Sequence, residues 1–211
     1  MKDNKYIDIS FPYCEGMAIY PNNPRYTCKR VSDMRRGDPC NVSQITIGTH
    51  TGTHLDAPLH FVGNGMAIDE IPLERINGKA KVLEITGQVI TISGLGQYLI
   101  EEDDIILFRT NNSDVFENNN VLDSYVTLDY ETAHYLVDKG VKMIGIDYMT
   151  IERPKAMREY GKSVHQILLG AGIPVLETID LRGVKGGEYT LMCFPLKLVG
   201  CDGSPVRAVL L

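Results

Sequence analysis

The sequence has no tryptophan, no basic excess and no long apolar run. Its 21 Lys and Arg residues are outnumbered by 27 Asp and Glu, and the net charge of −6 argues against a nucleic-acid partner, which would favour a basic surface. No segment approaches the roughly 18 apolar residues that cross a bilayer. The first residues also lack the apolar core of a signal peptide. We therefore expect no membrane partner and a cytoplasmic location.

Cysteine is scarce and irregularly spaced. The five cysteines are odd in number and form no C-x-x-C pair, which argues against a disulfide framework or a thiolate zinc knuckle. Cys193 lies in an apolar run and is expected to be buried. Hydrophobic residues make up 44% of the 211 residues, enough for a real core. Because the chain shows no linker and no repeat, we predict a single domain, residues 1–211.

Three of the five histidines lie in one stretch, His-Thr-Gly-Thr-His-Leu-Asp-Ala-Pro-Leu-His-Phe, at residues 50–61. The side chains in it that can bind a metal or transfer a proton all occupy even positions: His50, His54, Asp56 and His60. Residues two apart share a face of an extended chain, so these groups point one way. Imidazole and carboxylate without thiolate suit Zn(II), Mn(II) or Fe(II). The stretch therefore predicts a metal site.

The backbone geometry of this stretch has three alternatives. A helix would place His50 and His54 one turn apart, but Thr-Gly-Thr and the effect of Pro58 on the preceding residue disfavour it. A straight strand would separate the two histidine Cα atoms by roughly 13 Å, too far to share one ion. We therefore predict that residues 41–49 form a strand that delivers the histidines and that the chain bends at Gly52.

The remaining chain alternates strands and helices. Ser163 and Gln166 form a capping box that places His165 in the first turn of a short helix. Glu177 is a carboxylate on an otherwise apolar strand face, so it is either paired or a ligand. The main predicted strands are 105–110, 141–146, 173–179, 189–194 and 206–211, and the predicted helices are 128–139, with Thr127 as its cap, and 164–169.

Two regions have open interpretations. Residues 11–41 are rich in Pro, Asn and Gly and are predicted to form a long loop. This loop would cover the metal site, reach a neighbouring subunit or simply run over the surface.

Arg109 and Thr110 end a buried strand, where they would orient a substrate or cap the strand. His134 is expected to be exposed and not a ligand.

The stretch at residues 50–61 resembles the H-x-G-T-H-x-D-x-P-x-H signature of the cyclase-like metal hydrolases, a family that includes bacterial kynurenine formamidase and isatin hydrolase. Shorter similarities extend the resemblance nearly end to end: Asp8-Ile-Ser, Gly145-Ile-Asp147, Pro195-Leu-Lys-Leu-Val-Gly and Ser204-Pro-Val-Arg-Ala. The resemblance implies an α/β fold of the swivelling β/β/α type, with a mixed β-sheet core and a few flanking helices. It also implies a homodimer or homotetramer.

The resemblance further implies a centre of one or two metal ions, for which we expect zinc, with manganese as an alternative. His60 would be the acid–base residue. The ligands carried over from the family are His50, His54 and Asp56 for one ion, and His165 and Glu177 for a second ion that Asp56 bridges to the first.

The reaction implied is hydrolysis of a C–N amide bond by metal-activated water. The leading substrate is an arylformamide such as N-formylkynurenine, which would place the enzyme in tryptophan catabolism. The alternatives are hydrolysis of a cyclic amide or lactone, as in isatin hydrolase, and a metal-binding module without turnover. Two segments depart from the family pattern, 20–23 (Tyr-Pro-Asn-Asn) and 147–152 (Asp-Tyr-Met-Thr-Ile-Glu), and any aromatic wall must come from Tyr or Phe.

Overall fold

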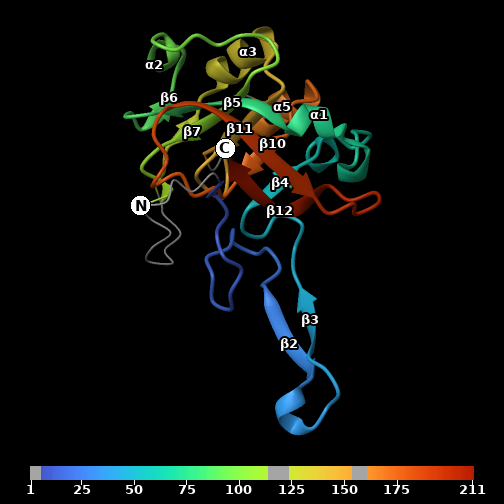
Figure 1. Ribbon diagram of the computed structural model, residues 1–211. Helices are drawn as coiled ribbons and strands as arrows, with labels where there is room; N and C mark the ends of the chain where they lie inside the picture. Colours follow the sequence, from blue (N-terminus) through green and yellow to red (C-terminus); the bar gives the residue numbers. More distant parts are fainter. Residues whose placement is uncertain (1–5, 114–123, 154–160) are drawn as a thin grey trace.

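An eight-stranded mixed sheet forms the body of the protein in the computed structural model, which describes residues 6–113, 124–153 and 161–211 (Figure 1). The strand order is β1-β12-β11-β5-β7-β9-β10-β4, and β4 also pairs with β12. Seven strands therefore close into a ring, with β1 attached to β12 on the outside. The strands are β1 (Ile7–Asp8), β4 (His54–Asp56), β5 (Gly78–Glu84), β7 (Ile105–Arg109), β9 (Met143–Ile146), β10 (Val175–Glu177), β11 (Gly187–Pro195) and β12 (Gly203–Leu210).

Side chains that alternate along the ring strands divide the core into two clusters. In β7, Ile105 and Leu107 belong to a cluster with members from every ring strand, so this cluster fills the ring. Ile106 and Phe108 belong to a second cluster, in which the outer face of the sheet packs against helices. The period of two along a strand produces this division. Cys193, expected to be buried, has no exposed surface in the ring cluster.

The helices cover one side of the ring (Figure 1). They are α1 (Leu73–Ile76), α2 (Ile92–Leu95), α3 (Tyr130–Asp138) and α5 (Val164–Gly170), with short 3-10 turns at η1 (Met34–Arg36), η2 (Pro58–His60) and η3 (Ile68–Glu70). The predicted capping box of Ser163 and Gln166 is present at the start of α5. α3 begins later than predicted, because residues 127–128 form β8 with β6 (Val89–Ile90) and Asp129, not Thr127, caps the helix.

The predicted α/β fold with a mixed sheet and a few flanking helices is confirmed. β7 and β9 are parallel neighbours with α3 between them in the chain, which forms a βαβ unit. The closure of the ring was not predicted. Among the described residues, no helix combines the length and apolar character needed to cross a membrane.

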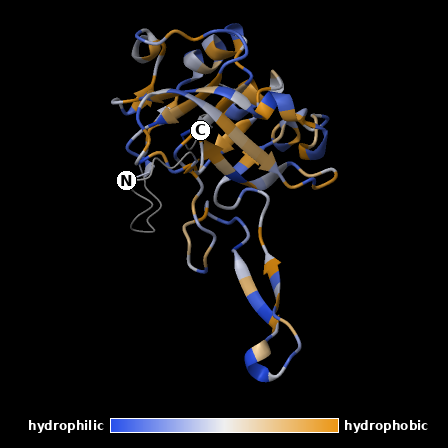
Figure 2. Cartoon of the chain, in the orientation of Figure 1, coloured by the Kyte–Doolittle hydropathy of each residue, from blue (hydrophilic) through white to orange (hydrophobic). Residues whose placement is uncertain are grey.

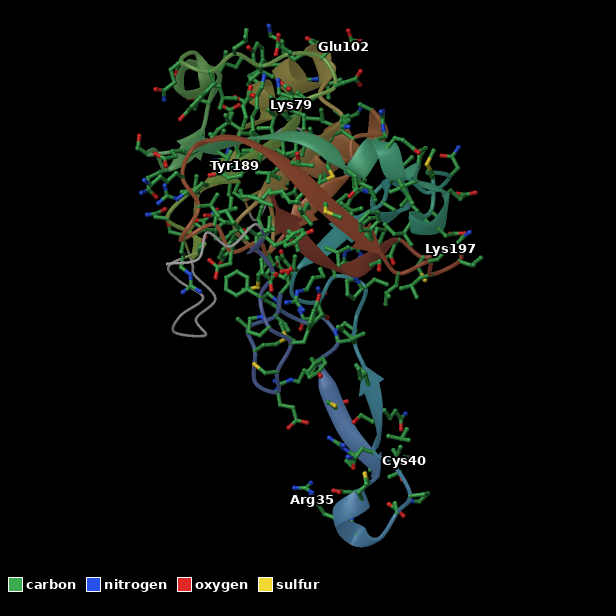
Figure 3. The ribbon with its side chains drawn as sticks, in the orientation of Figure 1. Arg35, Cys40, Lys79, Glu102, Tyr189 and Lys197 are labelled. Carbon is green, nitrogen blue, oxygen red and sulfur yellow. The ribbon has the colours of Figure 1, made fainter. Side chains whose placement is uncertain are left out.

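A two-stranded arm projects from the body (Figure 1). It consists of β2 (Thr27–Ser32) and β3 (Val42–Thr46), which pair antiparallel with each other and with no other strand of the described chain. Arg35 and Cys40 lie near its far end (Figure 3). Figure 2 shows hydrophilic residues along most of the arm, with hydrophobic residues interspersed.

The prediction of a loop over residues 11–41 is wrong for 27–32, and that of a strand over 41–49 is wrong beyond Thr46. Both strands of the arm are exposed on both faces, apart from the partly covered Ser32. The apolar–polar alternation that reveals a half-buried strand is therefore missing. β3 belongs to the arm, and it is β4, a separate short strand, that carries His54 and Asp56.

Candidate metal centre

The chain enters the centre through a sharp turn before β4. Gly52 has φ +62°, and a Cβ atom there would lie 2.7 Å from the Tyr13 ring, so the predicted bend at this glycine is confirmed. His50 lies in the turn, whereas His54 and Asp56 alternate with Leu55 along β4. Leu55 packs inside the ring. The two polar side chains therefore face its outer side.

Glu177 and His165 come from two neighbouring elements. β10 pairs antiparallel with β4 and places Glu177 directly opposite His54. The first turn of α5 brings the His165 ring over the same face, with its Nε2 atom 3.1 Å from Glu177 Oε1. Glu177 Oε1 also accepts a hydrogen bond from the Ile151 amide. Both side chains are almost fully buried.

The five predicted ligands form two groups that share Asp56. In the first group, Asp56 Oδ1 lies 2.7 Å from His50 Nδ1 and 3.3 Å from His54 Nε2. In the second, Asp56 Oδ2 lies 3.5 Å from His165 Nε2, which also contacts Glu177. The possible ligand atoms of each group lie within 4.8 Å of one another. This is the arrangement expected of two ions bridged by one carboxylate.

The donor set fits a cation. His54 Nδ1 donates to the Gly52 carbonyl at 2.7 Å, which leaves the Nε2 lone pair directed at the cluster. Asp56 Oδ2 and His165 Nδ1 are buried polar atoms without a hydrogen-bond partner. Burial, together with the nearby charge of Asp56, raises the pKa of Glu177. Two carboxylates held this close in a buried site need positive charge between them, and a metal ion supplies it.

His60 lies beside the two groups in the short turn η2. Its ring stacks on that of His50, with centroids 3.8 Å apart and planes at 25°. Burial lowers the pKa of His60 to about 4, and the positive charges of His50 and His165 act in the same direction against the pull of Asp56. His60 is therefore neutral near pH 7.

The pKa of His50 shifts in the opposite direction to that of His60. Burial alone would lower its pKa, but hydrogen bonds and charges from Asp56 and Asp202 raise it to about 9. Both carboxyl groups respond with lowered pKa values, because the histidine contacts outweigh the cost of burial. His50 therefore forms close ionic contacts with two carboxylates at the edge of the centre.

A cavity of about 220 Å³ opens onto both groups. Phe61 forms part of its wall and stacks on the His165 ring at 4.7 Å and 6°. Tyr20 and Met149 complete the non-polar part of the lining, and the described lining includes no Lys or Arg. The expected aromatic wall is therefore built from Phe and Tyr.

Arg109 and Thr110 do not line this cavity. Arg109 pairs with Glu84, and the Thr110 hydroxyl donates to the buried Asp147. Both side chains therefore form contacts at the ends of strands and do not contact the cavity. His134 is exposed on α3, as predicted.

Sequence reasoning missed two carboxylates that touch the centre. Asp202 Oδ2 accepts from His50 Nε2 at 3.0 Å, and Glu152 Oε2 lies 3.3 Å from His165 Nδ1. Asp202 stands next to the Ser204-Pro-Val-Arg-Ala stretch, and Glu152 ends the 147–152 departure. The location of both carboxylates near segments already compared with the family was the only hint in the sequence. Neither carboxylate has a sequence spacing from a histidine that would have predicted the contact.

The family model described as "Putative cyclase" matches residues 7–153, more than half of the chain. The chain belongs to the cyclase family. Its relatives in this family include the kynurenine formamidase of Salinibacter ruber, 33% identical over 97% of this chain and 96% of that protein. The kynurenine formamidase of Bacillus anthracis is 30% identical over 100% of this chain and 99% of that protein.

Two solved structures are similar to the chain. A potential metal-dependent hydrolase with cyclase activity is 34% identical, with a TM-score of 0.83 over 98% of this chain and 96% of that chain. Isatin hydrolase A from Ralstonia solanacearum has a TM-score of 0.86 over 97% of this chain and 90% of that chain. At 20% identity the second likeness shows a shared cyclase-family fold alone.

Proposed function

We propose that this cyclase-family protein is a metal-dependent amidohydrolase and that its substrate is an arylformamide of the N-formylkynurenine type. The observation that carries the proposal is the pair of ligand groups sharing the buried Asp56, with neutral His60 beside them at the cavity. The kynurenine formamidase relatives, which match the chain end to end, support the substrate class. Such a substrate would place the enzyme in tryptophan catabolism, in the cytoplasm.

In this proposal the metal is zinc, one or two ions, with manganese as the alternative. When bound, the metal supplies an activated water and polarises the substrate carbonyl. The residues that would hold it are His50, His54 and Asp56 for the first ion and Asp56, His165 and Glu177 for the second.

His60 is assigned the proton transfers. Its neutral ring accepts a proton as water attacks the carbonyl carbon, and it returns the proton to the leaving nitrogen as the C–N bond breaks. The ring is held by its stack on His50 and by the edge of Phe61, whose centroid lies 4.6 Å away. Phe61 and Tyr20 would flank the aryl group of the substrate in the cavity.

Hydrolysis of a cyclic amide or lactone is the second candidate. Its support is the likeness to isatin hydrolases, which at 19–23% identity extends to the fold. A metal-binding module without catalytic turnover has less support, because such a module would not need a neutral histidine, His60, beside the two ligand groups. We favour the formamidase function because the kynurenine formamidases have a higher sequence identity to this chain than the isatin hydrolases.

We also propose that the protein assembles as a homodimer or homotetramer. The arm supports this proposal, because Met34 and Ile45 are 60% and 58% exposed on a hairpin that packs against little else. An isolated two-stranded hairpin is at best marginally stable in water, and a second copy of the chain would cover it.

The test begins with metal content, measured by elemental analysis on protein purified without chelator, followed by N-formylkynurenine hydrolysis. We expect one or two ions per chain and turnover. The substitution His60→Ala should lower kcat by about 10²–10⁴-fold with the metal retained. His134→Ala on the surface of α3 is the control and should change nothing.

Metal with turnover of a lactam or lactone in place of the formamide would favour the second candidate. Protein without metal, even after reconstitution with zinc or manganese, would contradict the proposed function altogether.

A further inference from the structure

Asp202 is fixed against the histidine stretch by the backbone on both sides. Its carbonyl accepts from the Ala57 amide at 2.9 Å, and the next residue, Gly203, pairs with Asp56 across β12 and β4. A Cβ atom on Gly203 would lie 2.8 Å from the His50 ring, so only glycine permits this approach. The position of Asp202 is thus set by the closure of the ring.

The Asp202 carboxylate contacts two histidines of the stretch at residues 50–61 and the Thr49 side chain just before it. Oδ2 lies 3.0 Å from His50 Nε2 and 3.7 Å from His60 Nδ1. Oδ1 accepts a hydrogen bond from the Thr49 hydroxyl at 3.1 Å. The stacked rings of His50 and His60 therefore share one carboxylate, which is itself oriented by a neighbouring hydroxyl.

The two nitrogens of His50 have separate tasks in this geometry. Nδ1 faces Asp56 within the first ligand group, so as a ligand His50 would bind the ion through Nδ1 and donate the Nε2 proton to Asp202. A carboxylate on the outer nitrogen of a ligand histidine fixes its tautomer and ring orientation and raises its basicity as a ligand. Asp202 does not line the cavity, which is consistent with action through His50 and not on the substrate.

We propose that Asp202 is a positioning residue that holds His50 in its metal-binding tautomer and orientation and keeps the His60 ring stacked against it. The inference rests on the proposed function, since it concerns the same centre. Two other roles are possible for such a carboxylate: an ordinary surface ion pair, and a ligand to an ion shared with His50 and His60, whose ligand atoms also cluster with those of Asp202.

The experiment compares Asp202→Asn with Asp8→Asn. The two carboxylates are matched in exposure, 43% and 44%, and Asp8 pairs with Arg207 away from the cavity. Zinc affinity is measured by competition with a chromophoric chelator, and zinc content is measured at saturation. We expect Asp202→Asn to weaken zinc binding by about 10–100-fold with the wild-type number of ions at saturation, and Asp8→Asn to leave both unchanged.

Two further measurements separate positioning from general damage. The visible spectrum of the Co(II)-substituted protein should change in Asp202→Asn, because the ring at the first ion is no longer fixed. Thr49→Val removes only the hydroxyl that orients Asp202 and should weaken zinc binding in the same direction by a smaller factor, about 2–10-fold. This milder variant keeps the proposal testable if Asp202→Asn folds poorly.

Zinc affinity within twofold of wild type in Asp202→Asn would overturn the proposal in favour of a surface ion pair. Loss of one ion at saturating zinc would also overturn it, because Asp202 would then be a ligand. Wild-type protein that binds neither zinc nor manganese would overturn the proposed function together with this inference, whereas metal-loaded wild type with an unaffected variant overturns this inference alone.

Discussion

The ring includes antiparallel pairs and the arm is a single antiparallel pair, yet the surroundings of these pairs differ completely. β4 pairs with β10 on one side and β12 on the other, and all three of its residues are buried. β2 and β3 pair only with each other among the described strands, and none of their residues is buried. Strand pairing alone therefore does not bury an element in this protein.

The difference explains where the candidate chemistry lies. Metal ligands must be held within a fraction of an ångström, so they belong on elements whose side chains are locked by packing on every side. Among the described residues, the ligand groups come from the ring wall, the turn before it and α5. The arm carries no such group among its described residues and instead exposes apolar residues such as Met34 and Ile45, on which the proposed self-association rests.

The largest expected contrast concerns ion pairs. In the ring, Lys81 Nζ donates to Asp104 at 2.7 Å, to Glu101 and to the Leu99 carbonyl, and both Lys81 and Asp104 are buried. Asp104→Asn leaves the buried ammonium with one carboxylate fewer and should cost about 3 kcal/mol of unfolding free energy. For a chain of this length that is a fall in Tm of roughly 6–12 °C.

The matched change in the arm is Arg35→Ala. Arg35 pairs with Asp33, but its side chain is 85% exposed, and solvent screens the pair. Thermal unfolding followed by circular dichroism should show no measurable shift in Tm for this variant. Equal shifts in Tm for Asp104→Asn and Arg35→Ala would show that ion pairs in the ring and in the arm contribute equally to stability, contrary to this prediction.

The next contrast is between the metal-free and the metal-loaded ring. In protein treated with chelator, His50 has a pKa raised to about 9, and that of His165 is raised well above its ordinary value by Glu152 and Glu177 in spite of burial. A raised pKa means that the folded state binds more protons than the unfolded chain. The contribution of these two histidines to stability should therefore be full below about pH 6.5 and fall as the pH rises to about 9.

Zinc should reverse this dependence, since a ligand imidazole must be deprotonated and metal binding releases protons. Thermal scans from pH 6 to 9, with and without zinc, measure both slopes. Two parallel curves would contradict the assignment of His50 and His165 as ligands. The arm offers no comparable change, because none of its described residues belongs to a ligand group.

The parts of the centre that the sequence predicted are those with a local pattern. The period of two along β4 placed His54 and Asp56 on one face, and the bend at Gly52 followed from the reach of an imidazole. The capping box located His165 in the first turn of α5. Glu177 needed the family resemblance, because a single carboxylate in an apolar strand has two readings of equal weight.

The parts that could not be predicted depend on pairing between distant segments. Asp202 reaches His50 only because β12 pairs with β4 and closes the ring, and the two residues are 152 positions apart. No periodicity encodes that register. The prediction for the arm failed for a different reason. Strands exposed on both faces are not selected for an apolar–polar alternation, so the sequence of the arm lacks this signal. Local patterns therefore located the candidate metal site on the sequence, the family resemblance supplied its ligand set, and the partners around the ligands depend on topology.

The smallest effect on stability is expected where the effect on assembly is greatest. Ile45→Lys places a charge on an exposed residue of the arm, so the fold should be unaffected and Tm at low protein concentration should change little. If a second copy covers the arm, the buried charge should dissociate the assembly, and light scattering should report a lower mass. Leu99→Lys, a 74% exposed position on the body, is the control and should keep the wild-type mass. An unchanged mass for Ile45→Lys would remove the arm from the interface and leave its exposed apolar residues to another partner.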